Sequence, residues 1–241
     1  MPLSRFLIFT FIFIFTMMAQ ARLPGIDLRF KRLEFQAGLA NGQYMATDPY
    51  YTVSFKTTPS VFSLGLYGGN FNHIWSLSAT RGSFFLQNRP RQSFVTLATY
   101  STRLGMVNEH QNYWFFGATA RSYTYSRDLT IDGTTLDSAY ATQISPGMVL
   151  TYQHHLNRSV LLFTQLMLDI PVYSTMTPTS DQYSQVGGSF NNGILAELSQ
   201  HTGVGAELQI RQDRSSTFNG VDKTYSSTVE GTLLFKISYI F

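Results

Sequence analysis

Cysteine is absent from this sequence, and charged residues are scarce. Without Cys the 241-residue chain forms no disulfide, so its fold depends on backbone pairing and burial alone. Charged residues make up 13% of the chain, which is roughly half the share of a typical soluble domain. Aromatic residues reach 15%, with 20 Phe and 14 Tyr. This composition disfavours a soluble globular domain, whose surface would be short of charge.

Long apolar runs are also missing beyond the start of the chain. After residue 21 no stretch approaches the roughly 18 consecutive apolar residues of a membrane-spanning helix. A chain that enters a membrane without such helices must cross it with strands. In lipid every backbone group needs a partner, and a closed barrel gives each strand two neighbours.

The first segment has the features of an export signal. Arg5 precedes an apolar run over residues 6–18, and Ala19-Gln20-Ala21 is a small-x-small cleavage site. An uncleaved anchor is the alternative, but this run is shorter than the roughly 20 residues of a spanning helix. We therefore expect a signal peptide over residues 1–21 and a single mature domain over residues 22–241.

Large apolar residues occupy every second position at the end of the chain. The alternating positions are large and apolar: Leu233, Phe235, Ile237, Tyr239 and Phe241. Thr232, Lys236 and Ser238 stand between them, while Leu234 and Ile240 depart from the pattern. These residues resemble the closing strand of bacterial outer-membrane β-barrels, whose final Phe, with an aromatic residue two positions earlier, is an assembly signal. The resemblance covers about the last ten residues. It implies that Phe235, Ile237, Tyr239 and Phe241 address the chain to the barrel assembly machinery.

The same alternation recurs along the mature chain. It is clearest over residues 203–213, where Val204, Leu208 and Ile210 alternate with Glu207 and Arg211. Short polar turns alternate with longer polar stretches at residues 128–138, 174–192 and 214–224, which is typical of a barrel with both ends in the periplasm. The predicted strands cover residues 33–39, 62–67, 72–86, 93–104, 113–127, 141–154, 160–173, 191–199, 203–213 and 233–241.

These segments predict an all-β fold, a closed antiparallel transmembrane meander β-barrel of about ten strands. Eight or twelve strands remain alternatives, because residues 51–55 form either an extra strand or part of an external hairpin. A soluble β-sandwich or lipocalin-like barrel is disfavoured, since the few charges fall on the face opposite the aliphatic residues. We expect the protein in the bacterial outer membrane.

Charged residues fall on the face that the barrel turns inward. We expect a lumen charge network of Glu34, Arg103, Arg121, Asp169, Glu197, Glu207, Arg211 and Lys236. Because the two signs nearly balance, the favoured interpretation is a set of paired side chains that fills a narrow barrel. The alternative is a small hydrophilic conduit with a charge-lined constriction.

The sequence offers little evidence for catalysis. The five His are His73, His110, His154, His155 and His201, and adjacent residues such as His154 and His155 point to opposite faces of a strand. We expect no catalytic residue, metal, cofactor or nucleic-acid partner. Outer-membrane lipid and lipopolysaccharide phosphates are the expected contacts. The function expected is a structural role or a narrow pore. Adhesion through the loops at 174–192 and 214–224 is the alternative, and a lipid-modifying enzyme is the least favoured.

Overall fold

A computed structural model describes the backbone of residues 30–47, 52–57, 60–70, 72–86, 89–104, 112–131, 134–170, 172–174, 182–218 and 223–241. The expected signal peptide lies outside these residues. No helix in this part of the chain is long and apolar enough to span a membrane. The described residues form twelve strands: β1 Phe30–Thr47, β2 Thr52–Thr57, β3 Ser60–Gly69, β4 His73–Leu86, β5 Arg89–Leu104, β6 Asn112–Ile131, β7 Thr134–Asn157, β8 Val160–Asp169, β9 Tyr173–Ser174, β10 Gln182–Glu197, β11 Thr202–Phe218 and β12 Lys223–Ile240.

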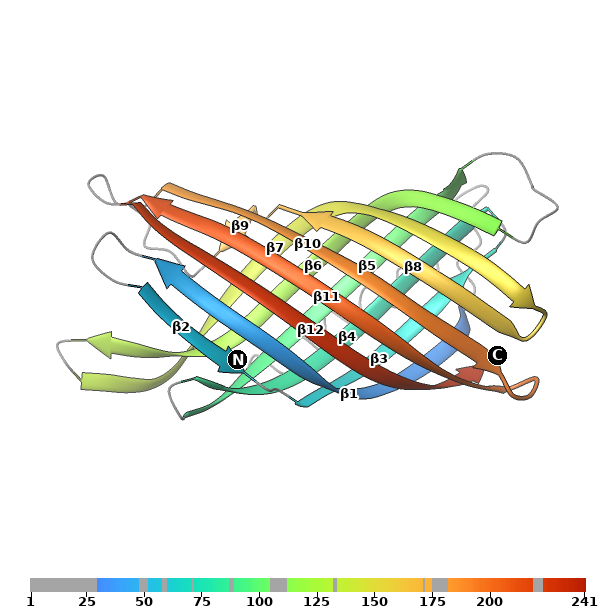
Figure 1. Ribbon diagram of the computed structural model, residues 1–241, viewed down its shortest axis with the longest axis horizontal. Helices are drawn as coiled ribbons and strands as arrows, with labels where there is room; N and C mark the ends of the chain where they lie inside the picture. Colours follow the sequence, from blue (N-terminus) through green and yellow to red (C-terminus); the bar gives the residue numbers. More distant parts are fainter. Residues whose placement is uncertain are drawn as a thin grey trace.

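Ten of these strands form the wall of a closed barrel (Figure 1). Each strand pairs antiparallel with the next along the chain, and β12 returns to pair with β1 from Arg32↔Ile240 to Thr47↔Tyr225. Closure leaves none of the ten as an edge strand, which is the condition for crossing a bilayer with strands. The predicted antiparallel meander of about ten strands is confirmed.

The two remaining strands extend the wall at one end. β2 pairs with residues 42–47 of β1, so the predicted segment, described from Thr52 onward, belongs to a hairpin at this end and adds no strand to the wall. β9 pairs Ser174 and Tyr173 with Gln143 and Ile144 of β7. Neither strand changes the strand number of the barrel.

The opposite end of the barrel carries tight turns. Asn70 Oδ1 accepts hydrogen bonds from the backbone N–H groups of Asn72 (2.8 Å) and His73 (3.0 Å). Gly69 before it has φ +127°, a conformation that favours glycine. Asn157 Oδ1 accepts from the N–H of Ser159 (2.8 Å) in the β7–β8 turn. β12 also ends here. Outer-membrane barrels place short turns in the periplasm, so the expected outer-membrane location makes this the periplasmic end.

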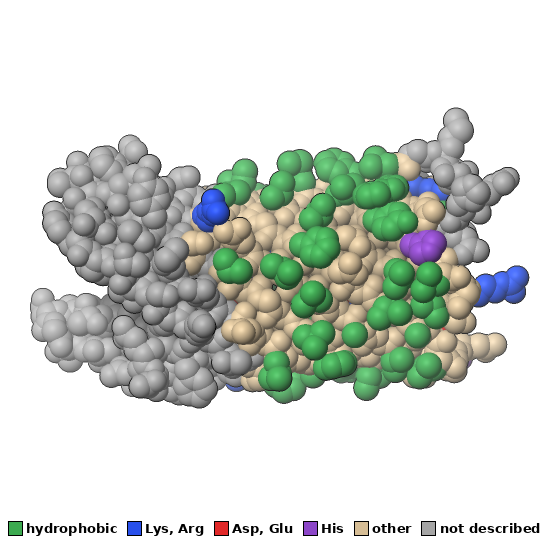
Figure 2. All heavy atoms as spheres, in the orientation of Figure 1, with side chains coloured by type: hydrophobic (Ala, Val, Ile, Leu, Met, Phe, Trp, Pro, Cys, Tyr) green, Lys and Arg blue, Asp and Glu red, His purple; other side chains and the backbone are tan. Residues whose placement is uncertain are grey.

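The outer surface of the barrel is apolar. Phe35, Phe235 and Ile237 are 58%, 63% and 63% exposed, and Leu208 and Leu168 are exposed as well. Figure 2 shows hydrophobic side chains spread over the described part of one face, where no acidic side chain is visible. This is the reverse of a soluble barrel, which packs its bulky apolar residues inside. The outward phase therefore matches a lipid-facing wall.

Aromatic side chains gather toward the periplasmic rim. His73 stacks on Tyr100 with ring centroids 5.9 Å apart, and His201 stacks on Tyr239 at the same distance. Trp114 lies 4.7 Å from Tyr152. Rings with one apolar and one polar part suit the level of the lipid headgroups.

The interior of the barrel is mainly polar. Gln143, Ser145, Asn191 and Thr232 are all buried, although they carry hydrogen-bonding groups. Apolar side chains are buried as well: Leu234, Ala40 and Val61 form a small cluster, and Phe115, Val149 and Met167 are also buried. Leu234 breaks the alternation of β12 because it points inward, into that cluster.

Candidate functional site: two charge clusters in the lumen

Four charged side chains meet inside the periplasmic half of the barrel and form what we call the periplasmic cluster. Arg32 Nε lies 2.6 Å from Glu34 Oε1, and Lys236 Nζ lies 3.3 Å from Glu34 Oε2. Lys236 also contacts Glu207 Oε2. Two cations thus face two carboxylates, contributed by neighbouring strands β1, β11 and β12. The cluster is neutral as a whole.

Amide side chains complete the hydrogen bonding of these carboxylates. Gln36 Nε2 donates to Glu34 Oε2 (2.9 Å) and lies 3.1 Å from the hydroxyl of Tyr67. Gln209 Nε2 donates to Glu207 Oε1 (2.7 Å). Each amide stands two residues from its carboxylate and therefore lies on the same face of the strand, because alternate residues of a strand share a face. Local sequence therefore supplies part of the network.

Two aromatic rings extend the periplasmic cluster across the lumen. Lys236 Nζ lies 5.0 Å from the ring centroid of Phe163 on β8 and 5.9 Å from that of Tyr67 on β3. The Arg32 guanidinium lies 4.8 Å from the Tyr67 ring. In the strand order β3 and β8 are five steps apart around the ten-strand wall, so this layer spans the diameter of the barrel.

A second group, the outer cluster, lies nearer the external end of β11. Arg211 binds Asp169 through Nη2 (2.9 and 3.1 Å) and binds Asp213 through Nη2 (2.6 Å) and Nε (2.8 Å). Arg121 Nη1 lies 3.8 Å from Asp169 Oδ2, and its guanidinium lies 5.1 Å from the centroid of the Tyr123 ring. Again two cations face two carboxylates. Because they come from β6, β8 and β11, this layer also crosses the lumen.

Gly187 of β10 leaves the space that the outer cluster occupies. A Cβ at this position would lie 2.5 Å from Arg211 Nη2 and 2.9 Å from Asp169 Oδ1, and closer still to Asp213 Oδ1. Both distances are below normal contact. A residue with a side chain would therefore push the ion pairs apart.

Most of the cluster charges are buried, although the side chains of Arg32, Arg121, Arg211 and Asp213 stay 22%, 12%, 17% and 21% exposed. Side-chain exposure is 1% for Glu34, 3% for Lys236 and Asp169, and 6% for Glu207. Charges buried to this degree are stable only when they are paired and hydrogen-bonded. The geometry holds that pairing in two successive neutral layers.

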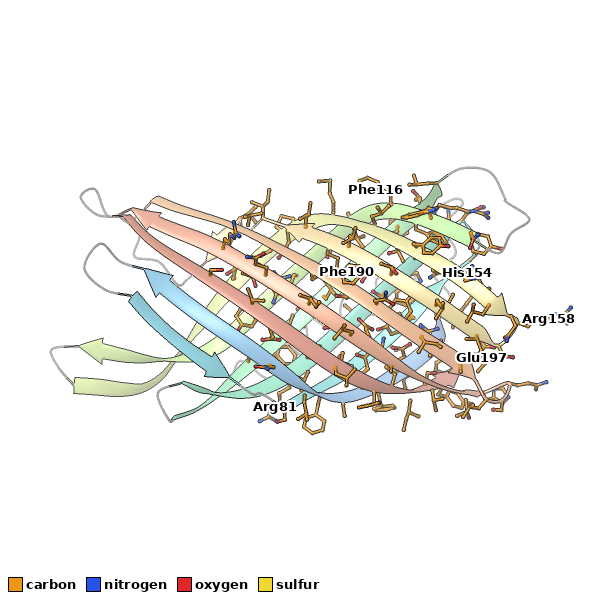
Figure 3. All side chains as sticks on the ribbon, in the orientation of Figure 1. Arg81, Phe116, His154, Arg158, Phe190 and Glu197 are labelled. Atoms are coloured by element: carbon orange, nitrogen blue, oxygen red, sulfur yellow. The ribbon has the colours of Figure 1, made fainter. Side chains whose placement is uncertain are left out.

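Six of the eight charged residues expected in the lumen belong to these clusters: Glu34, Glu207, Lys236, Arg121, Asp169 and Arg211. Arg103 lies apart, with its guanidinium 4.5 Å from the ring of Tyr113. Glu197 has the inward phase but is the last residue of β10, and its side chain is exposed at the periplasmic end beside Arg158 (Figure 3). Alternation gives the face of a residue and not its height.

Two partners in the clusters escaped the sequence reasoning. Arg32 stands two residues before Glu34, and Asp213 stands two residues after Arg211. Period-two spacing from a residue already assigned to the lumen is the signal that would have found both.

The last strand places the expected assembly residues on the outer face. Phe235, Ile237, Tyr239 and Phe241 are all at least half exposed. Phe241 N donates to Lys31 O (3.0 Å) where β12 meets β1. Their role as an assembly signal remains a prediction.

Other chemistry is sparse in the part of the chain whose side chains are described. Four of the five His lie there, all near the periplasmic end: His73, His154, His155 and His201. His154 Nδ1 contacts Asn112 Oδ1, while the His155 ring packs edge-on against Tyr113 (5.9 Å). No group of three His, Cys, Asp or Glu side chains comes together among these residues. His110 lies outside them.

Comparison with known proteins finds similarity in structure only. No family model and no curated protein sequence matches the chain. The outer-membrane protease OmpT of Escherichia coli superposes with a TM-score of 0.54 at 8% identity, covering 91% of this chain and 99% of that one. The Neisserial surface protein A gives a TM-score of 0.40 at 12% identity (87% and 97% covered). A COG4313 outer-membrane channel from Pseudomonas putida F1 gives 0.42 at 13% (92% and 100%).

The fold and the comparisons define the class of protein. A closed antiparallel barrel with an apolar outside and a polar, ion-paired inside crosses a membrane with its strands. The superposition on OmpT shows that the two chains share this fold. The chain is a β-barrel protein of the bacterial outer membrane.

Proposed function

We propose that this barrel is a sealed, non-catalytic scaffold of the outer membrane that carries an interaction surface on its external strand extensions. The observation that supports it best is the burial of the lumen charges in two neutral layers, each crossing the barrel. An ion that passed would have to separate these ion pairs. A scaffold needs this rigidity, whereas a pore needs a wet path.

Strand length supports the second half of the proposal. A strand needs roughly 9–11 residues to cross the membrane, but β6 has 20 residues and β7 has 24. β12 and β1 each have 18. Because the strands start at tight periplasmic turns, the surplus lies on the external side. The barrel thus holds paired β-structure above the membrane, where a partner meets it.

A narrow pore is the second candidate. It is favoured by the polar lining beside the clusters, which includes Gln143, Ser145, Thr151 and Asn191. Conduction would then require the ion pairs to separate. A catalytic role like that named for OmpT has weaker support, because the four described His lie near the periplasmic rim, far from the external surface.

Conductance of the full-length folded barrel in a planar bilayer tests the proposal. The wild-type protein is expected to give no unit conductance steps. The double variant Arg211→Ser, Lys236→Ser removes one cation from each layer and is expected to give flickering openings. Arg158→Ser, which removes an exposed charge at the periplasmic turn, is the matched control and should stay silent.

Stable conductance steps in the wild-type protein would overturn the sealed barrel in favour of the pore. A silent double variant that is folded, as judged by its heat-modifiable migration in a gel, would show that the ion pairs are not the seal. For the external surface, exchange of residues 175–186 and 215–224, which include the external ends of β10, β11 and β12, should abolish binding to whatever cell-surface partner the wild type captures. Intact binding after exchange would contradict that part of the proposal.

A further inference from the structure

Arg81 faces the membrane side of the wall. Arg81 of β4 pairs in register with Phe62 of β3 and Phe94 of β5, and Phe62 is 63% exposed on the outer surface. Since paired residues on adjacent strands share a face, Arg81 points outward between two rings. It is itself exposed, and Figure 3 shows it projecting from the outside of the barrel.

Arg81 stands at the edge of an apolar groove on the outer wall. The groove has a volume of about 570 Å³ and crosses β12, β1, β3, β4 and β5. Small residues, Ala37 and Ala79, leave the depression, and large ones rise beside it. The large neighbours are Phe35, Phe62, Leu64, Phe94, Phe235 and Ile237. None of the residues that line it is acidic.

The height of Arg81 places it in the outer leaflet. β4 begins at His73 beside the periplasmic turn, so Arg81 lies eight residues up the strand. At about 3.3 Å per residue and a tilt of about 40°, this corresponds to roughly 20 Å, against an apolar band about 25 Å tall. From there the long side chain reaches the headgroup level of the outer leaflet.

We propose that this groove binds the lipid A part of lipopolysaccharide, with one phosphate on Arg81 and one acyl chain between the Phe side chains. A guanidinium presents paired donors that match a phosphate, and an apolar trough beside it matches the chain attached to that headgroup. A free phosphate would not use the trough. A phosphorylated, multiply acylated glycolipid of the outer leaflet uses both parts, at the depth where they lie. The site goes beyond the scaffold role and does not depend on it.

Native mass spectrometry of the full-length barrel tests the proposal. The folded protein is released from detergent micelles that contain bis-phosphorylated lipid A, and the fraction that retains one lipid is measured. Arg81→Gln should lower retention about tenfold, which is the effect of losing one charge-assisted contact. Ala37→Leu, which fills the groove and keeps the charge, should also lower it. Arg214→Gln is the matched control, because Arg214 is exposed on β11 outside the groove.

Four results would overturn the site. If Arg81→Gln retains as much lipid A as wild type, Arg81 does not bind the phosphate. If Arg214→Gln loses as much retention as Arg81→Gln, the lipid is attracted to surface charge in general. If dephosphorylated lipid A is retained as well as the phosphorylated form, the groove does not recognise the phosphate headgroup. Equal retention of phosphatidylglycerol shows that any anionic lipid occupies the groove. Heat-modifiable migration of each variant establishes that it is folded before retention is compared.

Discussion

Replacement of Lys236 by Met removes one cation from the periplasmic cluster and leaves two buried carboxylates facing each other. Glu34 keeps Arg32 at 2.6 Å and Gln36 at 2.9 Å, whereas Glu207 keeps the hydrogen bond from Gln209 at 2.7 Å. Breaking a buried ion pair by removing one partner costs about 3–5 kcal/mol. Because Arg32 still neutralises Glu34, we expect a loss near the low end, about 3 kcal/mol of the free energy of unfolding.

A compensating change separates charge imbalance from lost packing. The double variant Lys236→Met, Glu207→Gln removes one charge of each sign, so the cluster stays neutral around the Arg32–Glu34 pair. Exchange of a buried ion pair for neutral groups of similar volume is often nearly neutral. We therefore expect the double variant to recover to within about 1 kcal/mol of wild type.

Urea unfolding of the barrel in lipid vesicles measures both effects, with Trp75 and Trp114 as fluorescent reporters. Lys31→Met, at an exposed position on the neighbouring strand β1, is the control and should change stability by less than about 0.5 kcal/mol. A loss below about 1 kcal/mol in Lys236→Met would refute the reasoning. So would a double variant less stable than the single one.

Three further outcomes are expected. Gly187→Ala should destabilise the barrel by about 1–3 kcal/mol in the same unfolding assay, because its Cβ overlaps the outer cluster. Gly188→Ala is the control and should stay close to wild type, because its Cβ would make ordinary contacts at 3.4 and 3.5 Å. Leu208→Arg places a charge roughly halfway up the lipid-facing wall and should cost about 2–4 kcal/mol, against about 0–1 for Leu198→Arg at the periplasmic rim; equal costs would contradict a membrane at that level. Phe241→Ser should reduce the amount of barrel inserted in cells and leave unassisted refolding in detergent unchanged, whereas normal insertion would remove the assembly role.

The wall of the barrel was predictable because each strand repeats one simple rule. On β12 the alternation of Leu233, Phe235 and Ile237 with Thr232 and Lys236 gives the lipid and lumen faces directly. Where both faces are apolar, as over residues 160–163, alternation gives no phase. There the structure turns Phe163 inward beneath Lys236, and Leu161 pairs with the buried Leu195.

The meeting of charges across the lumen was not predictable from sequence. Arg121 and Arg211 are 90 positions apart, and which carboxylate lies between them depends on the tilt and register of five strands. The position of a residue along the barrel axis was not predictable either, because Glu197 has the inward phase but lies at the end of its strand. Register is a property of the closed barrel, whereas phase is a property of each strand.

The natural absence of Cys allows one measurement to test the lipid-facing wall and the sealed lumen together. Single Cys residues along β12, each carrying a nitroxide spin label, are compared for collision with oxygen dissolved in the bilayer and with a nickel complex dissolved in water. Labels at Leu233, Phe235 and Ile237 should meet oxygen and not nickel, while labels at Thr232, Leu234 and Ser238 should meet neither. Access of nickel to the inward positions would contradict a sealed lumen, and access of nickel to the outward positions would contradict a membrane-spanning wall.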